Sequence, residues 1–170
     1  MAPVTVFAIQ YVFSFVVYTM IVVWFVIPKL RQKSIAGAIT PLLFLHAMRY
    51  IGLTYLAPGV TDPTLPQEFT GPTGYGDLIS ATLAIIAIFA LRNRPKSSSL
   101  DLAIILVWLF NIVGFVDLAI ALTIGLRVQI LNYQLASMWF IPTFIVPALV
   151  VTHVAIFWML WKHHKGEWQS

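Results

Sequence analysis

The sequence has no cysteine and very little charge. The absence of cysteine excludes disulfide bonds, thiolate metal sites and cysteine nucleophiles. Charged residues make up only 9% of the 170 residues, whereas hydrophobic residues make up 60%. A soluble domain carries about a quarter charged residues, so water cannot be the solvent for most of this surface. The sequence therefore predicts a membrane protein whose main partner is the lipid bilayer.

The basic residues are few, and they do not form a nucleic-acid surface. The formal charge of +4 comes from short basic runs that separate apolar stretches, as membrane topology requires. The N-terminal stretch has no charge before Lys29. It is too long for the apolar part of a signal peptide, which spans about 7–15 residues. We therefore expect this stretch to be a retained first transmembrane helix.

Five stretches are long and apolar enough to cross the hydrocarbon core, which takes about 20 residues. The predicted helices cover residues 5–27, 35–57, 74–91, 101–126 and 135–161. No internal repeat is visible, and the chain length fits one domain. We predict an all-α membrane protein, a single five-transmembrane-helix bundle that is multi-pass in the inner (cell) membrane.

The orientation follows from the basic residues between the predicted helices. With five helices, eight cations fall on one side of the membrane: Lys29, Arg31, Lys33, Arg92, Arg94, Lys96, Lys162 and Lys165. The opposite segments, 58–73 and 127–134, carry one cation, Arg127. The positive-inside rule then predicts an N-terminus outside the cell and a cytoplasmic C-terminus.

Proline and glycine mark the expected boundaries and kinks. Segment 58–73 is rich in proline, threonine and glycine, so we expect it to be an outer loop. Gly76 is interpreted as part of a turn that opens the third helix. Asp77 is then a water-exposed carboxylate in the first helical turn. Pro142 and Pro147 are expected to kink the fifth helix.

Polar groups at membrane depth are the candidate functional residues, because they are expensive in lipid. We counted about 1.5 Å per residue from the predicted helix ends. By this measure His46, Asn111 and His153 fall near mid-membrane, and Arg49, Asp77 and Asp117 fall nearer the outer surface. Two polar layers result, and three different helices supply each of them.

Arg49 carries a permanent charge and needs a counter-charge. Asp77 and Asp117 are the only carboxylates that the prediction places at outer membrane depth, so we predict that Arg49 pairs with at least one of them. One negative charge is then left for water, a proton or a bound cation to neutralise. His46, Arg49 and Tyr50 stand at i, i+3 and i+4, so a regular α-helix presents all three on one face.

These residues predict a polar interior that binds a small or lipid-like ligand reached from the outer side or from the bilayer. The predicted binding residues are His46, Arg49, Tyr50, Asn111, Asp117 and His153. A quinone, a lipid headgroup or haem b would suit such a site. His46 and His153 lie at matched height, as axial haem ligands must, and Arg49 could meet a propionate. This pattern resembles the general design of small haem-b membrane cytochromes. A bare metal site would need three or four ligands, which two histidines do not supply.

Two alternatives come from other functional classes. The chain could be an accessory subunit of a larger membrane complex, with its polar residues serving assembly alone. It could instead be a proton-coupled transporter that works as a homo-oligomer and uses Asp117 and His46. A buried Arg–Asp pair also serves to fix helix packing without any ligand. No nucleophile, base and orienting group are readable together, so the sequence does not predict catalysis.

Overall fold

The structure of the protein is a computed structural model that describes residues 1–93 and 101–168. The described part is helical and contains no strand. Within these residues five helical spans are long and apolar enough to cross a membrane, which confirms the predicted number. They are Pro3–Leu30, Ile35–Leu56, Gln67–Arg92, Leu102–Arg127 and Ala136–His164. Arg94 and Lys96, two of the cations used to predict the orientation, lie outside the described residues.

Three of the five spans are assembled from helices of different type. The first joins α1 (Pro3–Ile21), the π-helix η1 (Val22–Val26) and α2 (Ile27–Leu30). The second joins α3 (Ile35–Ala47) to the 3-10 helix η2 (Met48–Leu56). The last joins the 3-10 helix η4 (Ala136–Trp139), the π-helix η5 (Ile141–Ile145) and α6 (Val146–His164). The helices α4 (Gln67–Arg92) and α5 (Leu102–Arg127) are continuous, and a short 3-10 helix, η3 (Ile130–Asn132), follows α5.

Each π-helical stretch lies just before a proline. The helix η1 ends two residues before Pro28, and η5 ends two residues before Pro147. Proline has no N–H, and its ring displaces the carbonyl four residues earlier, so the chain accommodates it with a wider turn. The fifth span is therefore irregular around Pro142 and Pro147, where the sequence predicted a kink.

The helix α4 begins at Gln67, seven residues before the predicted start at position 74. Pro72 lies inside this helix, close to its first turn. It removes only the hydrogen bond to the carbonyl of Glu68, so the helix continues through it. The predicted loop is thus wrong for residues 67–73. As a consequence Asp77 lies in the interior of the helix rather than in its first turn.

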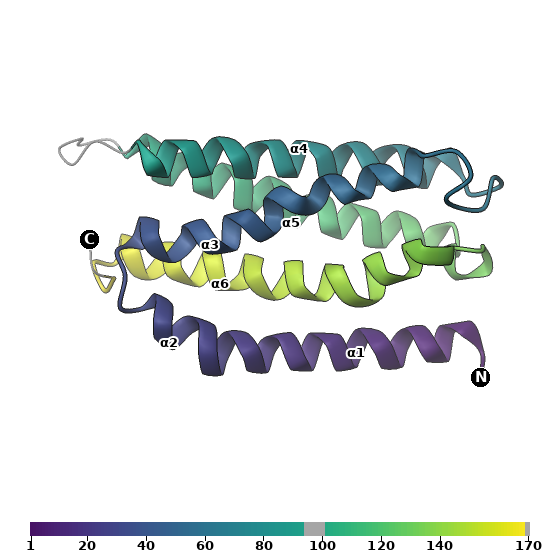
Figure 1. The fold of residues 1–170 in the computed structure, drawn as a ribbon, viewed down its shortest axis with the longest axis horizontal. Helices are drawn as coiled ribbons and strands as arrows, with labels where there is room; N and C mark the ends of the chain where they lie inside the picture. The colour runs from purple at the N-terminus through teal and green to yellow at the C-terminus, as the bar shows by residue number, and fades with distance from the viewer. Residues whose placement is uncertain (94–100, 169–170) are drawn as a thin grey trace.

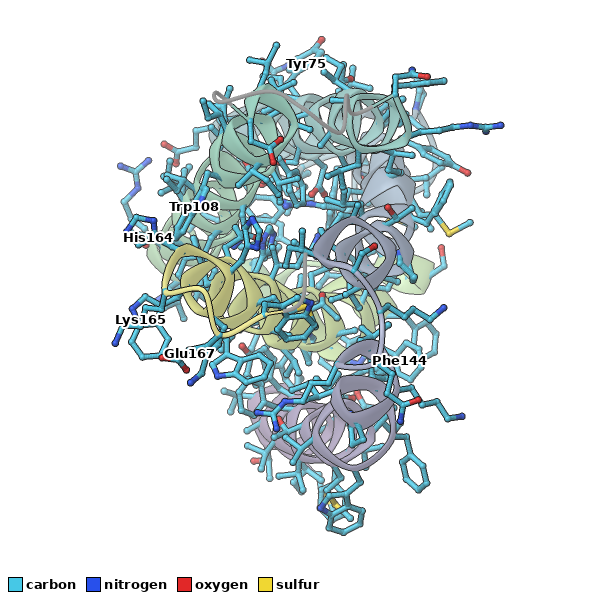
Figure 2. The ribbon with its side chains drawn as sticks, turned by 90° about the vertical axis from the view of Figure 1, so that its left-hand side faces the viewer. Tyr75, Trp108, Phe144, His164, Lys165 and Glu167 are labelled. Atoms are coloured by element: carbon cyan, nitrogen blue, oxygen red, sulfur yellow. The ribbon has the colours of Figure 1, made fainter. Side chains whose placement is uncertain are left out.

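The helices α1 and α4 lie at opposite edges of the bundle, as both views show (Figures 1 and 2). The helix α4 packs against α5, α3 and η2. The helix α1 packs chiefly against α6 and η5, and none of its residues is buried. The two chain termini lie at opposite ends of the long axis, which we call the N-terminal end and the C-terminal end of the bundle (Figure 1).

An apolar core fills the half of the bundle toward the C-terminal end. Fully buried side chains from α3, α5 and α6 form its centre: Ile39, Leu43, Val107, Ile156 and Met159. Ala84 and Ala87 of α4 complete it, and their small size lets the helices approach closely. This packing closes the polar interior off from the C-terminal end.

Polar contacts fasten the loops at the N-terminal end. The Asp62 carboxylate accepts a hydrogen bond from the Thr64 hydroxyl at 2.6 Å and from the Gln134 backbone N–H at 3.3 Å. These bonds hold the pKa of Asp62 below its usual range, and the bond from the Thr64 side chain has the largest effect. The loop before α4 is thereby joined to the segment before the last span.

Aromatic and basic residues fasten the C-terminal end, which faces the viewer in Figure 2. The Trp168 indole donates to the carbonyl of Lys33 at 3.2 Å. The Arg31 guanidinium lies 4.9 Å from the ring centre of Trp158, and Lys162 pairs with Glu167. The segment after α6 therefore packs on the connection between the first two spans.

Candidate functional site

A change of helix type sets the face of the second span that points into the bundle. From Met48 to Leu56 the chain is a 3-10 helix, in which residues three apart lie above one another. The buried residues on this face are His46, Arg49, Gly52 and Tyr55. Tyr50 is instead 56% exposed. The prediction that Tyr50 lies beside Arg49 is therefore wrong, because three-residue turns rotate it away from the interior.

Arg49 lies at the centre of a buried ion-pair cluster and is only 1% exposed. Its Nε donates to Oδ1 of Asp77 at 2.8 Å, and its Nη2 donates to Oδ2 of Asp117 at 2.5 Å. The predicted pairing of Arg49 with at least one carboxylate is confirmed, and it involves both. The expectation that Asp77 is water-exposed is wrong, since it is buried. The second span is thus joined to α4 and α5 through one side chain.

The third guanidinium nitrogen of Arg49 faces backbone and imidazole. Its Nη1 donates to the carbonyl oxygen of Gly114 at 3.0 Å and lies 3.4 Å from Nε2 of His153. Every nitrogen of this guanidinium therefore has an acceptor beside it. A buried arginine that is satisfied on all sides holds one geometry, which is what a preorganised site needs.

Asn111 and His153 form a two-bond pair between α5 and α6. The Asn111 Nδ2 donates to the His153 carbonyl at 3.1 Å, and its Oδ1 lies 2.7 Å from Nδ1 of His153. Because an amide oxygen is only an acceptor, Nδ1 of His153 carries the proton. The lone pair of the neutral ring is then at Nε2, which faces Nη1 of Arg49. Asn111 therefore sets the tautomer that accepts from the arginine.

His46 is held by a threonine on α6. The Thr152 hydroxyl donates to the carbonyl of Ala148 at 2.7 Å, and its oxygen lies 3.0 Å from Nε2 of His46. A hydroxyl that already donates must accept from the ring, so Nε2 of His46 carries the proton. The buried Nδ1 of His46 has no hydrogen-bond partner among the described residues.

The two core histidines do not fit a haem. Their ring centroids lie 4.1 Å apart, so the imidazoles touch each other. A haem between two axial histidines needs room for the macrocycle and for two iron–nitrogen bonds of about 2 Å each. His46 and His153 were matched in height correctly, but the helices approach too closely for such a ligand. The described residues also contain no group of three or more metal-ligating side chains.

Three glycines make room for the charged cluster. A Cβ on Gly52 would lie 2.7 Å from Cβ of Asp77, and a Cβ on Gly76 would lie 2.7 Å from Cγ of Asp117. A Cβ on Gly114 would lie 2.8 Å from Cε1 of His153. Each distance is shorter than a van der Waals contact. These positions therefore require glycine for close approach, and not for a turn.

A cavity of about 360 Å³ adjoins the ion-pair cluster on the side of the N-terminal end. Its polar lining at the cluster consists of Tyr55, Thr73, Asp77 and Asp117. The remaining walls are mainly apolar and come from α1, α5, η3 and the start of the last span, including Phe7, Leu118, Ile141 and Val146. This volume suits a small amphipathic molecule.

The cavity reaches the surface between α1 and α5. Leu122 and Leu126 of α5 line it and are 53% and 71% exposed, and Val4 of α1 also lies at this rim. The helix α1 packs chiefly on α6 and η5, so no broad helix contact closes this side. The cavity thus opens on a mainly apolar part of the helical surface.

A family model matches residues 6–161, which is most of the chain. The chain belongs to DUF8737, a domain of unknown function. Neither a curated protein nor a solved structure matches it. The matched range of the DUF8737 domain includes the ion-pair cluster, the histidine pair and most of the cavity lining.

The sequence prediction for this DUF8737 domain missed part of the site. The structure brings together five of the six predicted residues, His46, Arg49, Asn111, Asp117 and His153. It adds Asp77, Thr73 and Thr152, and also the glycines at positions 52, 76 and 114. Glycine inside a predicted helix was the available signal, because it often marks a close approach of neighbouring groups.

Proposed function

We propose that this DUF8737 protein is an integral membrane protein that binds an amphipathic ligand in the cavity beside Arg49. The observation that supports this is the distribution of polarity in that cavity. Asp77 and Asp117 lie at its inner end, whereas the exposed lining is mainly leucine and valine, with Gln129 and Asn132 the polar exceptions. A ligand with a polar head and an apolar tail matches both ends. Quinones and single-chain lipids remain suitable classes, whereas haem does not.

We infer that the protein lies in the inner (cell) membrane. The N-terminal end of the bundle would then lie outside the cell and the C-terminal end in the cytoplasm. Lys29, Lys33, Lys162 and Lys165 all lie at the C-terminal end, as the positive-inside rule requires of a cytoplasmic surface. The cavity would then open in the outer leaflet, where lipids can enter between α1 and α5.

The inferred orientation is testable because the chain has no cysteine, so one introduced thiol is a unique reporter. Gln67 and Gln32 are exposed at the two ends of the bundle. In intact cells we expect a membrane-impermeant maleimide to label Gln67→Cys and to leave Gln32→Cys unlabelled until the membrane is permeabilised. The reverse pattern would show that the orientation is inverted.

Filling the cavity is expected to abolish ligand binding. Ala121 of α5 lines the cavity, and an indole at this position would occupy the space of the ligand tail. We expect Ala121→Trp to weaken the binding of dodecyl-chain probes (dodecylamine, 1-dodecanol and dodecyltrimethylammonium) by at least about tenfold, as measured by titration calorimetry in maltoside micelles. Ala119→Trp is the matched control, because Ala119 is exposed on the same helix and does not line the cavity. Equal binding by the two variants would rule out the cavity as the site.

Two other functions have support of their own. The helix α1 has no buried residue and packs chiefly on one neighbouring span, which favours an accessory subunit that meets a partner chain along α1. The excess of carboxylates over Arg49 favours a proton-coupled transporter. The apolar core between the cluster and the C-terminal end counts against transport, because it offers no polar route through the described residues. Ligand binding from one side is therefore the function that the geometry supports best.

A further inference from the structure

The charge of the ion-pair cluster indicates which head group the cavity would take. Arg49 contributes one positive charge, and Asp77 and Asp117 contribute one negative charge each when ionised. His153 is neutral in the tautomer that Asn111 fixes, so it does not change the sum. The cluster then carries a net charge of −1 beside an apolar cavity. A charge in such surroundings needs a partner, which is either a proton or a cation.

One oxygen of each cluster carboxylate has no hydrogen-bond partner among the described residues. Arg49 uses Oδ1 of Asp77 and Oδ2 of Asp117. The other oxygen of each carboxylate accepts no hydrogen bond from the described residues, and both aspartates line the cavity. Each of these oxygens lies where a Cβ on Gly52 or on Gly76 would be, so a side chain at either position would displace it. Because no described residue donates to them, both oxygens can still accept a hydrogen bond from a bound molecule.

A third polar group in the same cavity is independent of the carboxylates. Thr73 lies one helical turn before Asp77 on the same face of α4, and it is only 7% exposed. It lines the cavity, and its buried Oγ1 has no hydrogen-bond partner among the described residues. A buried hydroxyl without a partner is unfavourable, so its presence here points to a group that the cavity takes up.

From this geometry we propose that the ligand is an amphiphile with a protonated primary amine, whose ammonium group binds between Thr73, Asp77 and Asp117. This inference rests on the proposed ligand-binding function. An ammonium group carries three N–H donors and one positive charge. It therefore satisfies the three free acceptors and neutralises the cluster at the same time. Phe7, Tyr55 and Phe69 also line the cavity, and aromatic side chains are compatible with a bound cation.

Three dodecyl-chain probes test the head group by titration calorimetry on the purified full chain in maltoside micelles. We expect dodecylamine to bind at least about tenfold more tightly than 1-dodecanol, because charge-assisted hydrogen bonds replace neutral ones. Dodecyltrimethylammonium has the same charge without N–H donors, so it should bind more weakly than dodecylamine. If 1-dodecanol binds as tightly as dodecylamine, a proton neutralises the cluster and the amine proposal is overturned.

Thr73→Val is the decisive variant because it removes the free hydroxyl without touching the ion pairs. We expect it to weaken dodecylamine binding by about threefold to tenfold and to leave 1-dodecanol binding unchanged. Thr82→Val on the exposed side of α4 is the matched control. Unchanged dodecylamine binding by Thr73→Val would overturn the proposed head-group site. If Ala121→Trp weakens the binding of none of the probes, the proposed ligand-binding function itself fails. That outcome differs from the one in which the probes bind in the cavity without a preference for the amine.

Discussion

Replacing Arg49 by methionine is expected to remove a large part of the stability of the bundle. Methionine keeps an unbranched apolar side chain, but it leaves the carboxylates of Asp77 and Asp117 buried and close together without a counter-charge. Removing one partner of a buried ion pair costs about 3–5 kcal/mol, because the remaining charge stays desolvated. The Gly114 carbonyl also loses its donor. A loss of this size is a large part of the about 5–15 kcal/mol by which folded domains are stable.

The measurement is the unfolding midpoint of purified protein in a sodium dodecyl sulfate titration, followed by circular dichroism. Arg127→Met is the matched control, since Arg127 pairs with Glu68 at 2.6 Å on an exposed surface. Exposed ion pairs contribute about 0–1 kcal/mol, so this variant should unfold almost as the wild type does. Equal shifts of the unfolding midpoint in the two variants would show that the buried ion pairs of Arg49 stabilise the protein no more than an exposed ion pair does.

A rescue variant separates charge from packing. Adding Asp77→Asn and Asp117→Asn to Arg49→Met removes both uncompensated carboxylates while keeping the side-chain volumes. We expect the triple variant to recover a large part of the lost stability, because replacing a whole buried ion cluster by neutral groups is often close to neutral. If the triple variant is as unstable as Arg49→Met alone, the loss comes from packing and not from buried charge.

The ion pair was predictable because a buried charge needs a counter-charge, whatever the detailed structure is. An arginine within an apolar stretch cannot lose its proton, so a carboxylate of another span must face it. Asp117 was identified by that argument alone. The number of spans was predictable for a similar reason, since length and hydropathy are properties of the sequence.

The faces of the helices were less predictable because they depend on helix type. A regular α-helix would have placed Tyr50 beside Arg49, but the 3-10 helix η2 places Gly52 and Tyr55 there instead. The sequence gives no clear signal for a nine-residue 3-10 helix, since such stretches are usually short. Likewise Pro72 suggested a loop, although one proline near a helix start removes a single hydrogen bond.

The histidine pair shows that membrane depth alone does not predict the distance between two side chains. Counting residues from the helix ends placed His46 and His153 at the same height, which is a statement about one coordinate. The distance between helices is set by the small residues and the interlocking side chains around them, which the count does not contain. In the structure the rings are 4.1 Å apart, so matched height means a direct contact rather than shared ligation.

Gly76→Ala is expected to cause the second largest loss of stability, although alanine has a higher helix propensity than glycine. Alanine is normally favoured over glycine in a helix by about 1 kcal/mol. At position 76, however, the added Cβ would lie 2.7 Å from Cγ of Asp117 and would push that carboxylate away from Arg49. Inserting a methyl group into a packed interior costs about 1–3 kcal/mol. We therefore expect net destabilisation, together with loss of dodecyl-probe binding.

Gly71→Ala in the same helix provides the comparison. A Cβ on Gly71 would have no neighbour within 4 Å, so this variant gains helix propensity without a clash. In detergent titrations Gly71→Ala should unfold at the wild-type midpoint or above it, and Gly76→Ala clearly below it. Adding Asp117→Ala to Gly76→Ala should remove the clash and give less than the sum of the two single losses, as expected for residues in direct contact. Strictly additive losses would mean that Gly76 does not make space for Asp117, and the close approach of α4 and α5 at the cluster would need another cause.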